Sequence, residues 1–258
     1  MGPTQKCGPK FRVVGGDHET APEMAFFEYC AMITYKGRQI PETFEEIVNP
    51  VHTALIVHEM RNDLREIGSF DKDGNTIHID FASIVTPIAR LLEEARNKYV
   101  RIIFAGYIGH STESLYSDVM VWRHHNTLLN PKTAPGPPGA VERSRGWQVI
   151  DELAPRESEM ILAKPRVDCF IGTNLELWLR WNGIRTIVIA GVGAEVGILP
   201  TTFHAINLGF FVVAPPDCIR GTAREWTGDA MKFIGGNAHG PLAIVQPSSD
   251  VIAAWERY

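Results

Sequence analysis

Apolar segments of strand length alternate with segments of helical periodicity along most of the chain, and this alternation limits the fold more than any other feature. Strands that are apolar on both faces need cover on both sides, which favours a parallel sheet between two layers of helices. The predicted strands are Thr53–Glu59, Arg101–Gly106, Glu159–Ala163, Thr186–Ala190, Phe210–Ala214 and Ala243–Gln246. The predicted helices are Ser83–Lys98, Leu175–Asn182, Val196–Leu208 and Arg224–Phe233. The sequence therefore predicts an α/β, doubly wound, Rossmann-like three-layer sandwich with a six-stranded, mainly parallel sheet.

Two regions do not fit this alternation. Residues 1–45 are predicted to form an N-terminal arm ahead of a single domain at 46–258, because 258 residues with 45% hydrophobic content can fill one large α/β core. The arm contains Phe26, Phe27 and Tyr29, too many aromatic residues for a disordered tail. We expect it to pack on a neighbouring subunit of a homo-oligomer, a dimer or tetramer. The long connection at 107–151 is expected to be a lid or an oligomer contact.

Charge and composition narrow the class of partner. The net charge is −5 with acidic and basic residues interspersed, so we expect no nucleic acid and no membrane surface as partner, but a small molecule. No apolar run reaches transmembrane length, and Met1–Gly16 lacks the apolar core of a secretion signal. We therefore expect a cytoplasmic protein whose four cysteines are reduced thiols.

In a doubly wound sheet the ligand binds beyond the carboxyl ends of the strands. The residues at these ends are Glu59, Tyr107, Lys164 and the glycine-rich turn Gly191–Gly197. They are far apart in the sequence, and we expect them to converge at one edge of the sheet.

Three motifs carry a resemblance to a known family. They are Thr53–Asp63, Ile161–Leu175 with Lys164 and the run Phe170-Ile171-Gly172-Thr173, and the strand and turn Thr186–Thr202. In this order they resemble the motifs of the isochorismatase-like hydrolase superfamily, which has the cysteine hydrolase fold. The resemblance places Glu59 at the catalytic aspartate, Lys164 at the catalytic lysine, and Gly197 where the cysteine members have their nucleophile. It also implies a non-proline cis peptide at Val192–Gly193 and outward-facing N–H groups between Gly193 and Gly197 that hold an anion.

This resemblance implies a hydrolase without the nucleophilic cysteine. The isochorismatases proper also carry glycine at that position, and they hydrolyse a vinyl ether. By the same resemblance, the residues expected to contact substrate are Tyr107, Gly193, Ala194, His110 and Phe170. No cofactor is implied. No metal is implied either, because the histidines after the second strand lack the spacing of the metal-binding members.

Three functions remain open. The first is non-covalent hydrolysis of a small organic acid of the vinyl-ether type, with Glu59 as general acid/base and Lys164 as its electrostatic partner. The second is a catalytically inactive ligand-binding or scaffold protein. The third is amidase-type hydrolysis by water that Glu59 activates. Glu59 could also merely pair with Arg61, and His58, which alternates with Glu59, is expected on the other face of the sheet.

Overall fold

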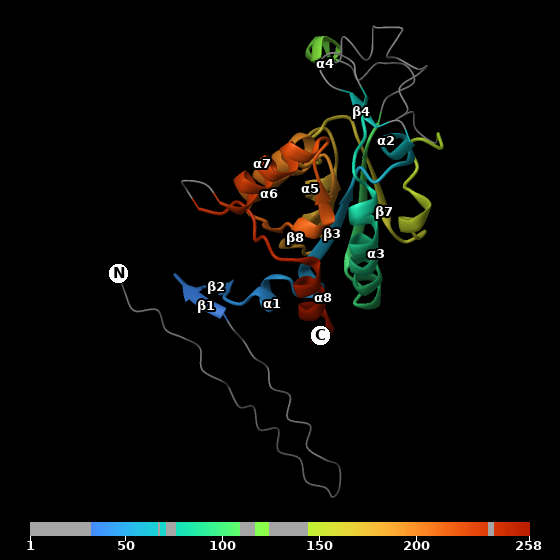
Figure 1. The fold of residues 1–258 in the computed structure, drawn as a ribbon. Coiled ribbons are helices and arrows are strands. Elements are labelled where there is room, and N and C mark those ends of the chain that lie inside the picture. The colour runs from blue at the N-terminus through green and yellow to red at the C-terminus, as the bar shows by residue number, and fades with distance from the viewer. Residues whose placement is uncertain (1–31, 67, 71–75, 109–116, 124–143, 237–239) are drawn as a thin grey trace, which may run out of the picture. The chain divides into compact units, whose positions relative to one another are not determined.

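The computed structural model describes residues 32–66, 68–70, 76–108, 117–123, 144–236 and 240–258 (Figure 1). Backbone contacts divide the chain into two units, residues 1–47 and 48–258. In the first unit, β1 (Met32–Tyr35) and β2 (Arg38–Pro41) form an antiparallel hairpin that α1 (Phe44–Ile47) follows. Phe26, Phe27 and Tyr29 lie outside the described residues, so the contact of the arm with a neighbouring subunit stays a prediction.

The second unit contains a six-stranded sheet in which every described pair of strands is parallel. Its strands are β3 (Thr53–His58), β6 (Arg101–Tyr107), β7 (Met160–Lys164), β8 (Thr186–Val192), β9 (Phe211–Val213) and β10 (Ile219–Arg220). Their order is β7-β6-β3-β8-β10, and β9 pairs with the amino-terminal half of β8 on the same side as β10. The predicted α/β fold with a mainly parallel six-stranded sheet is confirmed.

The helices of this unit are α2 (Asn62–Glu66), α3 (Ala82–Asn97), α4 (Asp118–Arg123), α5 (Leu175–Trp181), α6 (Leu199–Asn207), α7 (Arg224–Gly235) and α8 (Ser248–Glu256). The short elements are the 3-10 turns Pro50–His52, Asp151–Leu153 and Pro216–Cys218, the π-helical turn Ala194–Ile198, and the strand pair β4 (Ser69–Phe70) and β5 (Thr76–Ile77). Within the described ranges, no helix combines the length and the apolar character needed to cross a bilayer.

Two sequence predictions differ from the observed elements. The predicted strand Ala243–Gln246 is not a strand, because only Ile244 reaches the sheet, as an isolated bridge to Val213. The sixth strand is instead β10, whose two residues are too short to produce a readable alternation. The predicted helix Val196–Leu208 is also divided, since the π-helical turn Ala194–Ile198 precedes α6.

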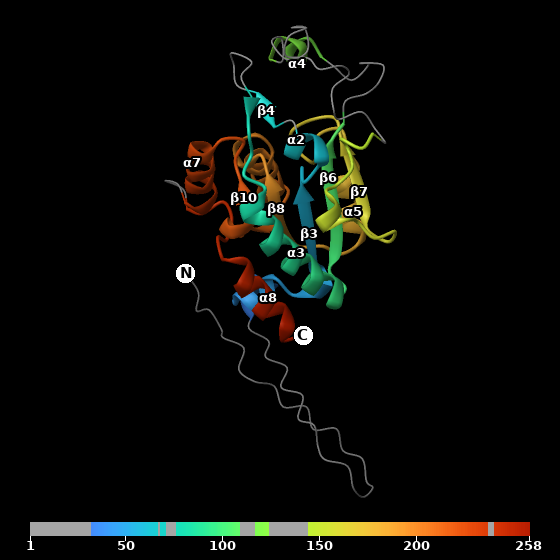
Figure 2. The ribbon, with the colours of Figure 1, turned by 45° about the vertical axis from the view of Figure 1, so that its right-hand side comes forward.

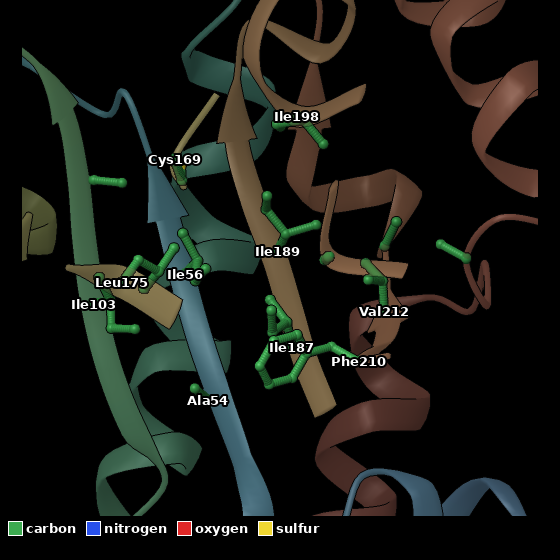
Figure 3. Close-up of a cluster of buried hydrophobic side chains, with 14 of the residues drawn as sticks. Ala54, Ile56, Ile103, Cys169, Leu175, Ile187, Ile189, Ile198, Phe210 and Val212 are labelled. Atoms are coloured by element: carbon green, nitrogen blue, oxygen red, sulfur yellow. The ribbon is translucent and has the colours of Figure 1, made fainter. Parts of the chain in front are cut away.

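Two layers of helices cover the sheet. Alternate residues of β3 and β8, among them Ile56 and Ile189, pack with Leu175 of α5 and Ile198 in one apolar cluster (Figure 3). Helix α3 lies across the other face, in front of β3 and β6 in Figure 2, and buries Ile84, Ile88, Leu91, Leu92 and Ala95. Burying one large aliphatic side chain contributes about 1.5–3 kcal/mol, so both layers hold the sheet firmly.

The order of the strands reverses beside β3. The chain passes from β3 to β6 and β7 on one side, and then returns to place β8 on the other side of β3. In doubly wound sheets the ligand crevice opens at such a reversal, outside the carboxyl ends of the two central strands. Here those ends are His58 on β3 and Val192 on β8.

Candidate active site

Glu59 follows the last residue of β3 in a left-handed backbone conformation, with φ of 56°. Non-glycine residues rarely adopt this region, which costs about 1–2 kcal/mol, and they do so most often at functional sites. The backbone N–H of Glu59 still donates to the carbonyl of Ala105 on β6 (2.8 Å). The turn therefore begins at Glu59, directly after the strand, and Glu59 is 7% exposed.

The carboxylate of Glu59 joins the ends of three strands. Its Oε1 atom lies 2.7 Å from Nζ of Lys164 at the end of β7. The same oxygen accepts a hydrogen bond of 2.7 Å from the backbone N–H of Tyr107 at the end of β6. The Lys164 ammonium group lies 6.0 Å from the centre of the Tyr107 ring. The structure thus brings Glu59, Tyr107 and Lys164 together at one edge of the sheet.

Lys164 is 1% exposed and has three partners. Besides its ion pair with Glu59, its ammonium group donates to the carbonyls of Arg166 (3.3 Å) and Val167 (3.1 Å). A buried lysine needs such partners, because a desolvated ammonium group is costly when it is unpaired. All three N–H donors of Lys164 are therefore committed within the protein.

Arg61 supplies a second cation to Glu59. Its Nε atom lies 2.9 Å from Oε2 of Glu59, and its Nη2 atom lies 3.2 Å from Asp63. Its Nη1 group donates to the carbonyl of Tyr107 (2.6 Å). The pairing of Glu59 with Arg61 is therefore real, but it adds to the contact with Lys164 and does not replace it.

The two cations decide the charge of Glu59. Burial alone raises the pKa of this carboxyl group, but the charges of Arg61 and Lys164 outweigh burial and lower the pKa to about 2. Glu59 is thus a carboxylate at neutral pH. Asp63 shows the opposite balance, since burial raises its pKa despite the nearby charge of Arg61.

The glycine-rich turn after β8 is tighter than the sequence predicts. Gly193 has φ of 79°, and its carbonyl accepts hydrogen bonds from the N–H groups of Val196 (3.2 Å), Gly197 (2.8 Å) and Ile198 (3.1 Å). These three N–H groups therefore point into the turn, and the prediction that the N–H groups of the turn face outward is wrong for them. The predicted cis peptide at Val192–Gly193 is also wrong, because the described residues contain no cis peptide.

His58 occupies the space beside Gly197. A Cβ atom added to Gly197 would lie 2.5 Å from Nε2 of His58 and closer still to Cε1, so no side chain fits there while the ring stays. The Nδ1 atom of His58 lies 2.8 Å from the carbonyl oxygen of Val192. The backbone of Gly191 also lies against that of His58, because a Cβ atom at Gly191 would overlap the backbone carbonyl of His58.

The strand alternation predicts His58 on the face of the sheet away from the site, and the structure places its side chain in the site. His58 alternates with Ile56 and Ala54, whose face of the sheet packs under the turn at Gly197. Glu59 leaves this alternation because of its left-handed backbone, so both side chains reach the same edge. A signal was present: a histidine follows four apolar residues at the end of the strand, and the neighbouring strand ends in a turn with three glycines.

The ring of His58 is uncharged at neutral pH. Burial, and next the charge of Lys164, lower its pKa to about 4, although the charge of Glu59 and the carbonyls of Val192 and Val167 act against them. Nε2 is buried and has no hydrogen-bond partner of ordinary geometry among the described residues. The Val167 carbonyl acts on the ring without reaching that geometry.

The low pKa of His58 predicts a pH dependence of stability. Between its folded pKa of about 4 and its ordinary value of 6.5, the unfolded chain binds the extra proton, so acidification favours unfolding. At 1.36 kcal/mol per pKa unit, His58 should contribute on the order of 3 kcal/mol that is complete above pH 6.5 and lost by about pH 4. The loss due to Glu59 falls lower, between 4.5 and about 2.

Urea unfolding of the wild type and His58→Gln at several pH values between 4 and 7 measures this contribution. The wild type should lose more stability on acidification than the variant. His204→Gln is the matched control, because His204 of α6 pairs with Asp168 (2.8 Å) and the substitution leaves His58 unchanged. Parallel curves for the wild type and His58→Gln would show that His58 is not held uncharged.

The structure places three of the remaining predicted substrate contacts, Gly193, Ala194 and Phe170. Gly193 and Ala194 are buried in the turn beside His58. Phe170 is 7% exposed and belongs to the apolar cluster under α5 and α6, where its ring lies 4.9 Å from the ring of His204. His110 lies outside the described residues. Among the residues that are described, no three His, Cys, Asp or Glu side chains gather in a way that could hold a metal ion.

A cavity of about 540 Å³ lies farther along the same edge of the sheet. His78, Asp80, Arg220 and Arg224 contribute its charged and titratable lining, and neither Glu59 nor Lys164 lines it. Arg220 pairs in register with Val192, the residue whose carbonyl contacts His58. The cavity is therefore adjacent to the turn and carries two arginines that can bind a carboxylate group.

Comparisons with known proteins agree with this fold. The family model described as the isochorismatase domain matches residues 53–238. The chain is 27% identical over 211 residues to the ureidoacrylate amidohydrolase RutB of Stutzerimonas stutzeri (strain A1501), covering 80% of this chain and 85% of that protein. It is 28% identical over 210 residues to the RutB of Serratia proteamaculans (strain 568), covering 80% and 84%.

Solved structures show the same arrangement of strands and helices. A cysteine hydrolase from Pseudomonas syringae pv. phaseolicola 1448A superposes with a TM-score of 0.66 at 23% identity, covering 81% of this chain and 94% of that one. The N-carbamoylsarcosine amidase from Thermoplasma acidophilum superposes with a TM-score of 0.56 at 22% identity, covering 76% and 96%. At these identities the likeness concerns the fold alone.

Proposed function

This chain belongs to the isochorismatase family of hydrolases, and we propose that it hydrolyses a small amide or ureido acid with water as the attacking group and without a covalent intermediate. The ion pair of Glu59 and Lys164 is the electrostatic centre of this reaction. The observation that carries the proposal is that pair, fixed at 2.7 Å beside a turn in which Gly197 offers no nucleophile.

The two cysteines in the described residues do not replace the nucleophile. Cys169 and Cys218 are fully buried, and burial raises the pKa of their thiols to about 11 and about 12. A thiol attacks as the thiolate, so these side chains are unreactive at neutral pH. With neither described thiol reactive, we infer that water is the nucleophile of an acyl-transfer reaction at this site.

The charge of Glu59 favours amide chemistry over vinyl-ether chemistry. Hydrolysis of a vinyl ether requires a protonated acid that delivers its proton to carbon. Because Arg61 and Lys164 hold the pKa of Glu59 far below neutrality, its carboxyl group is ionised at pH 7 and is a poor proton donor. Hydrolysis of an amide instead requires a base that takes a proton from the attacking water. The protonated base is a cation, and the negative charge of ionised Glu59 stabilises it.

The adjacent cavity supports an acidic substrate. Arg220 and Arg224 line it, and the backbone of Arg220 on β10 is in register with Val192 of β8, the strand between β10 and β3. A small acid can place its carboxylate there while its amide or ureido group lies toward Glu59. The relatives named as ureidoacrylate amidohydrolases agree with this class of substrate.

The test is release of ammonia or amine from small N-carbamoyl acids, ureidoacrylate and monoamides of dicarboxylic acids, with isochorismate included. We expect at least one amide or ureido acid to turn over, and Glu59→Gln to lower kcat/KM a hundredfold or more. Pretreatment with iodoacetamide should leave the rate unchanged. The exposed carboxylate of Glu157 provides the matched control Glu157→Gln, which should keep the wild-type rate.

Each other outcome points to a different function. Loss of activity after alkylation would mean that a thiol takes part. Turnover of isochorismate in heavy water with deuterium in the carbon of the product would favour vinyl-ether hydrolysis. Binding of these acids without turnover would favour the ligand-binding function.

A further inference from the structure

We propose that His58 is the general base of this reaction and that its Nε2 atom takes a proton from the attacking water. This inference rests on the proposed hydrolysis and names the residue that performs its proton transfer. Three observations carry it: the position of the ring, its tautomer, and the partners of the competing base.

The position of the ring is that of a side chain at Gly197. The imidazole edge formed by Cε1 and Nε2 fills the volume beside the Gly197 backbone. That volume is where the family resemblance places the nucleophile, and it lies at the reversal of strand order between β3 and β8. In this chain the imidazole of His58 on β3 therefore occupies the volume that a side chain at position 197 would fill.

The tautomer follows from the contact with Val192. A carbonyl oxygen only accepts hydrogen bonds, so Nδ1 of His58 must carry the proton and donate it to Val192 (2.8 Å). Nε2 then bears a lone pair. This atom is buried and makes no hydrogen bond of ordinary geometry among the described residues, although the Val167 carbonyl also acts on the ring, and a catalytic role is one explanation for such a buried acceptor.

Glu59 is less suited to take the proton. Its Oε1 atom already contacts Lys164 and the N–H of Tyr107, and its Oε2 atom faces Arg61. These contacts stabilise the ionised form and weaken Glu59 as a base. The charge of Glu59 instead favours the protonated ring of His58, which is the form that exists after proton transfer.

The step balances within the protein and its substrate. As the water oxygen forms a bond to the carbonyl carbon, Nε2 takes one water proton and the π electrons move to the carbonyl oxygen. When the C–N bond breaks, the protonated ring returns that proton to the leaving nitrogen. The products are a carboxylic or carbamic acid and an amine or ammonia, and His58 is restored.

The experiment compares His58→Gln, His58→Ala and the matched control His204→Gln with a substrate that the wild type turns over. Gln keeps a donor for Val192 but has no basic nitrogen. We expect kcat to fall a hundredfold or more in both His58 variants, with KM changed less than threefold, and His204→Gln to keep the wild-type kcat. Circular dichroism and urea unfolding confirm that each variant is folded.

Chemical rescue separates catalysis from packing. Added imidazole should raise the rate of His58→Ala at least tenfold. Furan, a ring of similar size without a basic nitrogen, should leave the rate unchanged. Equal rescue by both rings, or a full rate in His58→Gln, would overturn the role of His58 and leave the hydrolysis standing. Absence of turnover by the wild type on every amide and ureido acid would overturn both.

Discussion

Gly197→Cys is expected to destabilise the protein by about 3 kcal/mol or more and not to create an active thiol. The new Cβ atom would lie 2.5 Å from Nε2 of His58 and would overlap Cε1. Neither group can move freely, because His58 is held by Val192 and Gly197 by its hydrogen bond to Gly193. The free energy of unfolding, measured with urea, gives the size of the effect.

The double variant His58→Ala/Gly197→Cys should relieve this overlap. Removing the ring opens the volume that the new side chain needs, so the double variant should be more stable than Gly197→Cys alone, a non-additivity that marks direct contact. With Cys7 and Cys30 replaced by serine, its new thiol should also react with iodoacetamide. A double variant no more stable than Gly197→Cys would mean that the ring does not fill this position.

Gly228→Cys is the matched control. Gly228 lies on α7 with open space around it, so a side chain meets no neighbour there. The substitution should be neutral or add up to about 0.5 kcal/mol of stability through higher helix propensity. If Gly197→Cys lowers the free energy of unfolding strongly and Gly228→Cys does not, the loss comes from the overlap with His58.

Lys164→Met is expected to lower the free energy of unfolding by about 3–5 kcal/mol, the usual cost of removing one partner of a buried ion pair. Methionine keeps most of the volume of the side chain, so packing changes little. The loss arises because Glu59 keeps its charge with Arg61 alone, while the carbonyls of Arg166 and Val167 lose a donor. Urea unfolding at pH 7 measures it.

Lys232→Met isolates the contribution of burial. Lys232 makes an ion pair of similar length with Asp229 (2.9 Å), but both side chains are exposed, and such pairs contribute less than about 1 kcal/mol. Glu59→Gln in the Lys164→Met background should regain part of the loss, because the unbalanced charge disappears. If Lys164→Met cost no more than Lys232→Met, the buried pair would not hold the site together.

The fold could be predicted because its signals are local. The apolar runs of β3, β6, β7 and β8 are long enough to be recognised as buried strands, and the buried face of α3 repeats at helical spacing. The two-residue strand β10 gives no such signal. The bridge at Ile244 resembled a strand because its neighbours are apolar, and pairing across the sheet decided otherwise.

The candidate site was only partly predictable. Glu59, Tyr107 and Lys164 were found because the ends of parallel strands meet at one edge. His58 was missed because the alternation of a strand assumes regular backbone angles, which Glu59 does not have. The inward-facing N–H groups of Val196, Gly197 and Ile198 were also missed, because a π-helical turn depends on hydrogen bonds that no residue pattern specifies.

The packing of His58 against Gly197 links two positions that are far apart in the chain. A relative with histidine at the end of this strand must keep glycine in the turn, since any larger residue would collide with the ring. A relative with cysteine in the turn needs a different side chain or rotamer at the strand end. Considered jointly, the two positions offer a way to sort members of the family into thiol-bearing and histidine-filled classes by their amino-acid sequences.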